Sequence, residues 1–309
     1  MTISPMLDFL SPYISTRRKL VRLFFSLSLS SAAFCASHAS YAANVTKAPF
    51  GSQHAMVVED GTGKVLLEKN STEKVPIASL TKLMTAMVVL DSKPDMDEKI
   101  SIEQADVDML KHSASHVPVG ATLSRRDVLQ LALMSSDNRA AASLARTYPG
   151  GRAAFEAAVQ AKITALGMHD TVLQEPTGLS PNNMSTAADL VKMAVAASRY
   201  PDIADITTDS SDLIKINGHN VEFHNTNKLV GKKGWDSILL SKTGFTNEAG
   251  NCLIMRLKLA GRQATLVLLN ARASSVRFLD ALNIRRLLAK QKDSHPSIVS
   301  VKQRTPDIR

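Results

Sequence analysis

The clearest hydrophobic signal in the chain is the run Leu83–Leu90, which is apolar at nearly every position. A helix that is apolar on all its faces is typically buried inside a domain. Pro76 and Ser79 stand just before the run, where a helix of this kind would begin. The pattern therefore predicts a buried helix that starts at about Ser79.

Short β-type runs occur at both ends of the chain. At the front, Ala55–Glu59 and Val65–Glu68 flank a glycine-containing turn, which predicts a hairpin. Three further runs lie near the other end: Ser237–Thr243, Cys252–Leu259 and Ala264–Leu269. Because strands joined by short links usually pair with one another, we predict one antiparallel sheet assembled from both ends of the chain.

Between about residues 101 and 200 the hydrophobic period is helical. Ser124 and Asp127 provide a helix start, and alanine-rich segments follow up to a stop near Pro201. A hairpin at Asn217-Gly218 and a final helix, Ser275–Lys290, complete the pattern. The predicted fold class is α/β: a five-stranded antiparallel sheet flanked by helices, with an inserted all-helical lobe at about 101–200.

Composition narrows the possible partners. The 309 residues are 44% hydrophobic and 21% charged, as in an ordinary globular protein with a sizeable core. The net charge of +9 is not clustered, and only 5% of the residues are aromatic, which argues against nucleic-acid binding. An acidic polymer or an anionic membrane surface fits this charge better.

The first 42 residues have the features of an export signal. Basic residues at 17–22 precede the short apolar stretch Leu23–Phe34, and Ser40-Tyr41-Ala42 offers small residues for a signal peptidase. We therefore expect a signal peptide at 1–42, a domain at 43–292 without an integral membrane segment, and a flexible tail at 293–309. An uncleaved anchor is the alternative. A lipoprotein attached through Cys35 is disfavoured by the bulky Phe34 before it.

Ser79 and Lys82 are the first candidates for chemistry. Three residues is just under one helical turn, so the two side chains share a face of the predicted helix. A hydroxyl beside an amine is a nucleophile beside its possible base, provided that burial keeps the amine neutral. The spacing by itself is weak, because Ser71 and Lys74 repeat it in a polar turn.

Two other motifs lie further along the chain. Ser136-Asp137-Asn138 lies at a break between two predicted helices. These residues either only cap a helix or also contact a ligand through the serine hydroxyl and the asparagine amide. Lys242-Thr243-Gly244 lies at the end of a predicted strand. It is either an ordinary strand end or a binding site, in which the lysine supplies a cation, the threonine a hydroxyl, and the glycine lets a ligand approach the strand backbone.

The three motifs together form a recognised set. S-x-x-K, S-x-N and K-T-G in this order resemble the penicilloyl serine transferase superfamily, which includes penicillin-binding proteins and class A β-lactamases. Four stretches are similar to the D-alanyl-D-alanine endopeptidases, low-molecular-mass penicillin-binding proteins of the penicillin-binding-protein-seven type: Pro76–Asp91, Leu131–Ser143, Glu175–Leu179 and Leu240–Asn247. The resemblance implies a β-lactamase/transpeptidase-like fold and a serine peptidase that needs no metal or cofactor.

The resemblance also implies a role for each motif. Ser79 would attack the carbonyl of a D-alanine, Lys82 would take its proton, and Ser136 would pass a proton to the leaving amine. Residues implied to bind the substrate are Asn138, Lys242, Thr243, Gly244 and Phe245, with the oxyanion between the backbone N–H groups of Ser79 and Phe245. The implied partners are cross-linked peptidoglycan peptides as substrate and β-lactams as covalent inhibitors, in the periplasm.

Several alternatives stay open. A D-alanyl-D-alanine carboxypeptidase of the related group usually carries a further β-rich domain and an amphipathic C-terminal helix, whereas only 65 residues follow Gly244 here. A class A β-lactamase is suggested by Glu175-Pro176, but the expected asparagine is missing from the next few residues. A non-catalytic wall-binding scaffold would not need all the chemical residues. A zinc enzyme rests only on His112 and His116, which lack a third ligand in the sequence.

Overall fold

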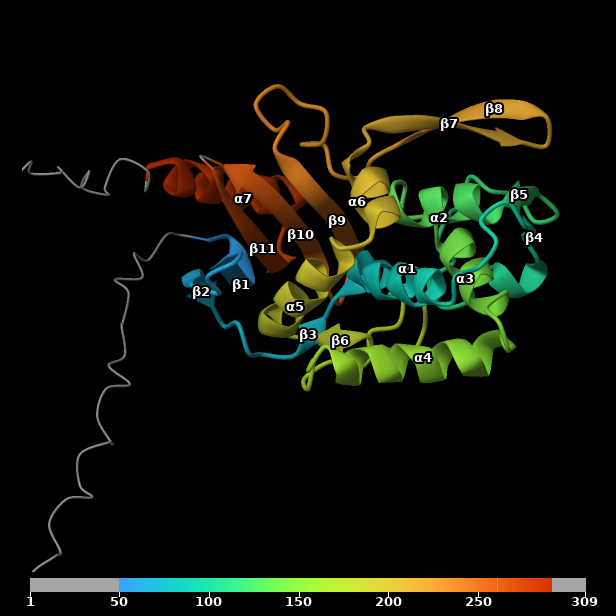
Figure 1. Cartoon of the computed structure of the whole chain (residues 1–309), viewed down its shortest axis with the longest axis horizontal. Helices are drawn as coiled ribbons and strands as arrows, with labels where there is room; N and C mark the ends of the chain where they lie inside the picture. The colour runs from blue at the N-terminus through green and yellow to red at the C-terminus, as the bar shows by residue number, and fades with distance from the viewer. Residues whose placement is uncertain (1–49, 260, 291–309) are drawn as a thin grey trace, which may run out of the picture. The chain divides into compact units, whose positions relative to one another are not determined.

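The computed structural model describes residues 50–259 and 261–290 of the chain (Figure 1). The predicted signal peptide at 1–42 and the predicted tail at 293–309 lie outside the described residues.

A five-stranded antiparallel sheet forms the base of the fold, with the strand order β2-β1-β11-β10-β9. Its strands are β1 (Ser52–Glu59), β2 (Val65–Lys69), β9 (Ile238–Thr246), β10 (Gly250–Leu259) and β11 (Arg262–Ala271). Val57 of β1 pairs with Leu266 of β11, so the first and the last strands of the chain are neighbours in the sheet. The prediction of one sheet built from both ends of the chain is confirmed, and β9 is its edge strand beside the helical lobe.

Both faces of the sheet are covered, which explains the unbroken apolar run in β10. Successive side chains of a strand point to opposite faces. Leu253 and Met255 pack in a cluster with residues of α7 (Ser274–Lys290), whereas Cys252 and Ile254 pack in a second cluster with residues of α5 (Ala187–Ala197). In Figure 1 these two helices lie on opposite sides of the sheet.

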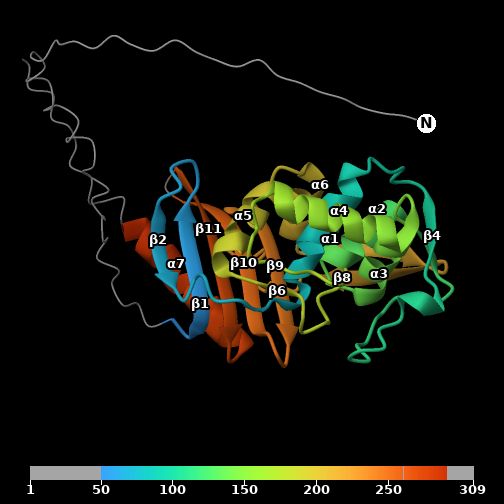
Figure 2. The same cartoon turned by 90° about the horizontal axis from the view of Figure 1, so that it is seen from below.

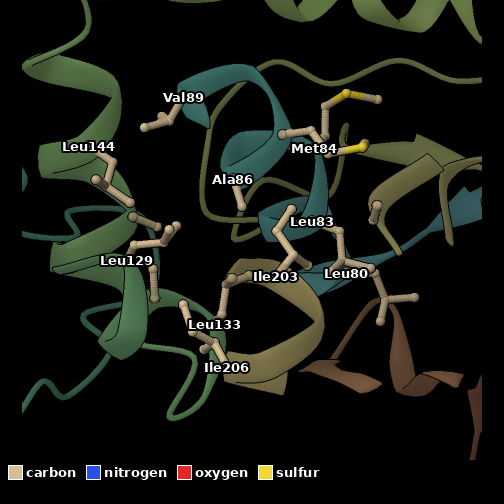
Figure 3. Close-up of a cluster of buried hydrophobic side chains, with 14 of the residues drawn as sticks. Leu80, Leu83, Met84, Ala86, Val89, Leu129, Leu133, Leu144, Ile203 and Ile206 are labelled. Atoms are coloured by element: carbon tan, nitrogen blue, oxygen red, sulfur yellow. The ribbon is translucent and has the colours of Figure 1, made fainter. Parts of the chain in front are cut away.

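The helical lobe is organised around α1 (Lys82–Asp91), in which all residues from Lys82 to Val89 are buried. Around it lie α2 (Arg125–Leu133), α3 (Asn138–Arg146), α4 (Gly151–Ala165) and α6 (Pro201–Thr208). Figure 3 shows Leu83 and Val89 of α1 among side chains of the neighbouring helices, including Leu129, Leu144 and Ile203. The prediction of a buried central helix is confirmed.

The lobe also contains elements that the sequence pattern did not predict. The helix end predicted near Pro201 is confirmed, since α5 ends at Ala197, but helix α6 was not predicted. Pro201 occupies the first turn of α6, where its missing N–H costs nothing. Two very short ladders, β3 (Val75–Pro76) with β6 (Met184–Ser185) and β4 (Lys99–Ser101) with β5 (Thr122–Ser124), show that the lobe is mainly rather than entirely helical. Runs of two or three residues are too short to produce a recognisable period.

The hairpin expected at Asn217-Gly218 is present as β7 (Ser211–Ile216) and β8 (His219–His224). Both turn residues have a positive φ, as the common two-residue hairpin turn requires. Figure 1 shows this hairpin extending along the helical lobe.

Asp280 of α7 joins the last helix to the first strand. Its buried carboxylate accepts hydrogen bonds from the backbone N–H groups of Gly51 (3.1 Å) and Ser52 (2.8 Å) and from the Ser52 hydroxyl (2.7 Å). Without that carboxylate, these buried donors at the start of β1 would lose their partner.

We expect Asp280→Ala to lower the free energy of unfolding by about 1–3 kcal/mol, because it leaves buried donors unsatisfied. Urea denaturation followed by circular dichroism measures this change. The control is Glu156→Ala on the exposed face of α4, expected within about 0.5 kcal/mol of the parent protein. An equal, small effect of both substitutions would contradict the role assigned to Asp280.

Candidate active site

Ser79 and Lys82 meet at the start of the central helix. Ser79 lies in a short 3-10 turn, η1 (Ala78–Thr81), and Lys82 is the first residue of α1. The Lys82 Nζ lies 2.9 Å from the Ser79 Oγ, so the three-residue spacing brings the two groups onto one face as predicted. The pair has the geometry of a hydroxyl nucleophile hydrogen-bonded to an amine.

The Lys82 amine is fully enclosed, and three segments of the chain contact it. Besides Ser79, its Nζ donates to the Asn138 Oδ1 (2.7 Å) and to the Thr177 carbonyl oxygen (2.8 Å). Burial lowers the pKa of Lys82 to about 8, and the nearby carboxylates, Glu175 first, only partly oppose this shift. At pH 7 roughly a tenth of such an amine is neutral and able to accept a proton.

Ser136 lies on the turn between α2 and α3, with a positive φ of 62°. Its Oγ accepts a hydrogen bond of 2.9 Å from the Lys242 Nζ, so the second and third motifs are in direct contact. Burial, then the nearby Lys82 and Arg277, hold the pKa of Lys242 well below its ordinary value. A bound carboxylate would offset this loss and favour the charged lysine.

The Ser-Asp-Asn turn directs its first and third side chains toward the lysines. Asp137 caps α3 by accepting from the Ala140 N–H (3.0 Å), and it also accepts from the Ser115 hydroxyl (2.7 Å). Asn138 begins α3, and its amide nitrogen donates to the Ser113 Oγ (2.8 Å). The amide is thereby oriented with its oxygen toward Lys82.

Gly244 allows the edge strand β9 to lie against the turn that holds Ser79. A Cβ at this position would lie 3.0 Å from the Ile77 carbonyl oxygen and 3.1 Å from the Ser79 backbone nitrogen. Beside it, the Thr243 hydroxyl bonds to the hydroxyl of Thr226 at 2.6 Å, and Phe245 is largely exposed. The sequence-predicted site residues are thus all brought together where the edge strand β9 meets the helical lobe, and this junction is called the candidate cleft here.

The loop at residues 175–183, for which the sequence suggested no such role, contacts Lys82 and holds it in place. The Glu175 carboxylate accepts from the backbone N–H groups of Thr177 (2.7 Å) and Gly178 (2.6 Å), and from the buried Asn183 amide (3.1 Å). This fold of the loop points the Thr177 carbonyl at the Lys82 amine. The sequence singled out Glu175–Leu179 only by its resemblance to the endopeptidases and to class A β-lactamases and did not indicate a contact with Lys82.

Gly178 brings the backbone of this loop close to the η1 turn that holds Ser79. It has a φ of 86°, and a Cβ there would lie 1.9 Å from the carbonyl oxygen of Ala78. Only glycine fits both this conformation and this distance.

Arg277 is a second residue that sequence reasoning missed. It lies on α7, is almost fully buried, and donates from Nη1 to the carbonyl oxygens of Gly244 and Cys252, both at 2.9 Å. It therefore links the last helix to the Lys-Thr-Gly strand and lies close enough to lower the pKa of Lys242. An arginine in a charged helix usually faces solvent, so no sequence signal distinguished it.

Two further side chains, the Cys252 thiol and the ring of the zinc candidate His116, pack against residues outside the three motifs. Cys252 is buried in β10, where burial raises the pKa of its thiol to about 11. His116 packs edge-on against Phe223, with ring centroids 6.4 Å apart. Within residues 50–259 and 261–290, His, Cys, Asp and Glu side chains do not gather in groups of three suited to a metal ion.

Comparison with known proteins agrees with this geometry. The family model described as D-alanyl-D-alanine carboxypeptidase, peptidase S11, matches residues 41–273. The chain is 47% identical over 271 residues to a D-alanyl-D-alanine endopeptidase of Pseudomonas aeruginosa, which covers 87% of each chain. It is 43% identical over 246 residues to a D-alanyl-D-alanine endopeptidase of Escherichia coli, which covers 79% of each.

Solved structures show the same fold. The Streptomyces K15 DD-transpeptidase superimposes with a TM-score of 0.72 at 28% identity, over 78% of this chain and 98% of the other. The transpeptidase-like fold predicted from the three motifs is therefore confirmed. Since the family model spans most of the sequence and two relatives are more than 40% identical to it over at least 79% of their length, the chain belongs to the peptidase S11 family of D-alanyl-D-alanine carboxypeptidases.

Proposed function

We propose that the protein is a serine D-alanyl-D-alanine endopeptidase that hydrolyses D-alanyl cross-links of peptidoglycan through an acyl-enzyme. The observation that carries this proposal is the buried Lys82 amine, whose pKa is about 8, hydrogen-bonded to Ser79. The D-alanyl-D-alanine endopeptidases of Pseudomonas aeruginosa and Escherichia coli, similar over most of the chain, support the choice of bond.

In the acylation step, the Ser79 Oγ attacks the carbonyl carbon of the cross-linking D-alanine while neutral Lys82 takes the hydroxyl proton. The C–N bond then breaks, and Ser136, hydrogen-bonded to Lys242, relays the proton taken up by Lys82 to the leaving amine, so that Lys82 becomes neutral again. An ester between Ser79 and the D-alanyl peptide remains. Water then attacks this ester and releases the second peptide.

Substrate binding uses the other side of the cleft. Lys242 and Thr243 bind the free carboxylate on the leaving side of the scissile bond, and Asn138 holds a peptide group on the acyl side. The backbone N–H groups of Ser79 and Phe245 stabilise the oxyanion, and the close approach of β9 to Ser79 at Gly244 supports this assignment. Loss of one such donor typically lowers the rate by about 10²–10³.

The alternatives fit the structure less well. In a β-lactamase reading Glu175 would hold a water, but here its carboxylate is engaged by the backbone of Thr177 and Gly178 and by Asn183. A non-catalytic scaffold would not require a buried lysine aligned on a serine hydroxyl. A carboxypeptidase that trims terminal D-alanine uses the same chemistry, and only substrate preference separates it from the endopeptidase.

The proposal includes a place in the cell. An N-terminal signal at 1–42 would export the domain, proposed at 43–292, to the periplasm, where cross-linked wall peptides and β-lactams are its partners. Among the helices within residues 50–259 and 261–290, none combines the length and the apolar character needed to cross a membrane.

We expect one covalent adduct when the protein is exposed to benzylpenicillin, and Ser79→Ala should abolish it because the attacking hydroxyl is gone. Intact-protein and peptide mass spectrometry locate the adduct. Ser71→Ala, in the second S-x-x-K copy, is the matched control and should acylate normally, since Lys74 of that copy pairs with Asp170 instead. An adduct that survives Ser79→Ala would exclude Ser79 as the nucleophile.

The acylation rate should rise with pH, because only the neutral form of Lys82 accepts a proton. With a pKa of about 8, the second-order rate constant is expected to climb about tenfold per pH unit below that value and to level off above it. Stopped-flow measurements of acylation by benzylpenicillin, made between about pH 5 and about pH 10, give the dependence of this rate constant on pH.

Substitutions by arginine separate the two lysines in the same assay. Lys82→Arg should abolish acylation at every pH, since a guanidinium does not deprotonate in a protein. Lys242→Arg should retain a measurable fraction, because its proposed role needs only a cation. Equal losses in both variants would show that these roles are wrong.

Offered both substrates, the protein should convert cross-linked muropeptide dimers to monomers faster than it trims monomeric pentapeptides. Chromatography of the digests with mass detection follows both reactions at once, and Ser79→Ala is the blank. Release of free D-alanine while the dimers persist would favour the carboxypeptidase instead.

A further inference from the structure

A segment outside the three motifs reaches across one end of the cleft. This segment, residues 107–116, is called the strap here; it follows the short turn η2 (Gln104–Asp106) on the helical-lobe side. In Figure 2 the green loop beside α3 and the tip of the orange β9–β10 hairpin both lie along the lower edge of the molecule.

The strap has a defined conformation. The Asp108 carboxylate accepts from the backbone N–H groups of Leu110 (2.7 Å), Lys111 (3.1 Å) and Ser113 (2.8 Å), which closes the strap on itself. Its other end contacts the second motif, because the Ser113 Oγ accepts from the Asn138 amide at 2.8 Å. The strap is therefore connected to a residue proposed to hold the substrate.

One ion pair joins the strap to the opposite wall. The Lys111 ammonium contacts the carboxylate of Glu248, which lies in the turn between β9 and β10, 137 residues further along the chain. Lys111 comes from the helical-lobe side and Glu248 from the sheet side, so the pair spans the cleft. We call this pair the clasp.

Exposed apolar side chains flank the clasp. Met109 and Leu110 of the strap are 71% and 63% exposed, and Phe245, three residues before Glu248, is 59% exposed. Large apolar side chains exposed beside a candidate site are typical of a surface that a ligand covers. The polar side chains of the strap lie on another side: Ser115 bonds to Asp137, and Ser113 bonds to Asn138.

The direction of β9 shows which part of a substrate would meet the clasp. Lys242 and Thr243, at one end of the motif, are proposed to bind the carboxylate on the leaving side. The strand then runs past Ser79 at Gly244 and continues through Phe245 to the turn that carries Glu248. A peptide on the acyl side of the scissile bond therefore extends toward the strap.

We propose that the clasp between Lys111 and Glu248 holds the strap over the cleft, and that Met109, Leu110 and Phe245 then form a subsite for the acyl-side stem peptide. The proposal rests on the proposed function of the same cleft. Lys111 and Glu248 are positioning residues: they act by placing the strap, and they take no part in bond breaking.

Charge reversal tests the clasp. Because such exposed pairs contribute little to folding, Lys111→Glu and Glu248→Lys should fold normally but lose the attraction that places the strap. For peptide substrates we expect each single variant to raise KM about fivefold with kcat nearly unchanged, as expected when binding energy is lost equally from ground and transition states. The double variant, with both charges reversed, should restore KM to within about twofold of the parent protein.

Two controls make the result specific. Arg152→Glu reverses one charge of the pair with Glu156 on α4, which is more exposed than the clasp and lies away from the cleft, and should leave KM unchanged. Acylation by 6-aminopenicillanic acid, a β-lactam without an acyl-side chain, should proceed at the same rate in all these variants because it does not reach the strap. Leu110→Ser should raise KM for peptides without slowing this acylation.

The measurement uses both a cross-linked muropeptide dimer and a monomeric pentapeptide, since both carry the same acyl-side stem. If the parent protein trims only the pentapeptide, the endopeptidase function is wrong, and the clasp is still measured on that substrate. If the single reversals leave KM at the value of Arg152→Glu, lower it, or are not rescued by the double reversal, the clasp proposal is overturned.

Discussion

The burial of one amine is the constraint on which the site depends. Lys82 is the first residue of the most enclosed helix in the described part of the chain, and its Nζ is held by groups from its own helical turn, from α3 and from the loop at 175–183. A buried lysine is costly unless its donors are satisfied or its charge is lost. Here the three acceptors satisfy and orient the amine, and burial lowers its pKa to about 8, so that a fraction of it is neutral near pH 7.

The same constraint explains why two glycines lie against the η1 turn that holds Ser79. Gly178 approaches Ala78 from the loop below Lys82, and Gly244 approaches Ser79 from the sheet edge. A side chain at either position would push apart the segments that enclose the amine and line the cleft. The core of the helical lobe, packed around α1, and the sheet, held against α7 by Arg277 and Asp280, bring these segments together.

Much of the fold and of the site could be predicted from local pattern. The apolar run after Ser79 determined a buried helix, and the β-type runs at both ends of the chain determined a shared antiparallel sheet, because the period and the length of such runs depend mainly on neighbours in sequence. The spacing of Ser79 and Lys82 determined that they share a face, because helical geometry is the same wherever the helix lies. The identity and order of the three motifs indicated the family, which the comparisons confirm.

Only the tertiary structure decided what surrounds these residues. Thr177, Gly178 and Asn183 support Lys82 although they lie about a hundred residues away, and Arg277 reaches Gly244 from the last helix. A further helix, α6, starts at Pro201 directly after the end of α5 and packs on the lobe, and Lys111 contacts Glu248, 137 residues away in the sequence. Contacts of this kind, and the pKa values that follow from burial, depend on which distant segments the fold brings together. The local sequence pattern does not determine which segments these are.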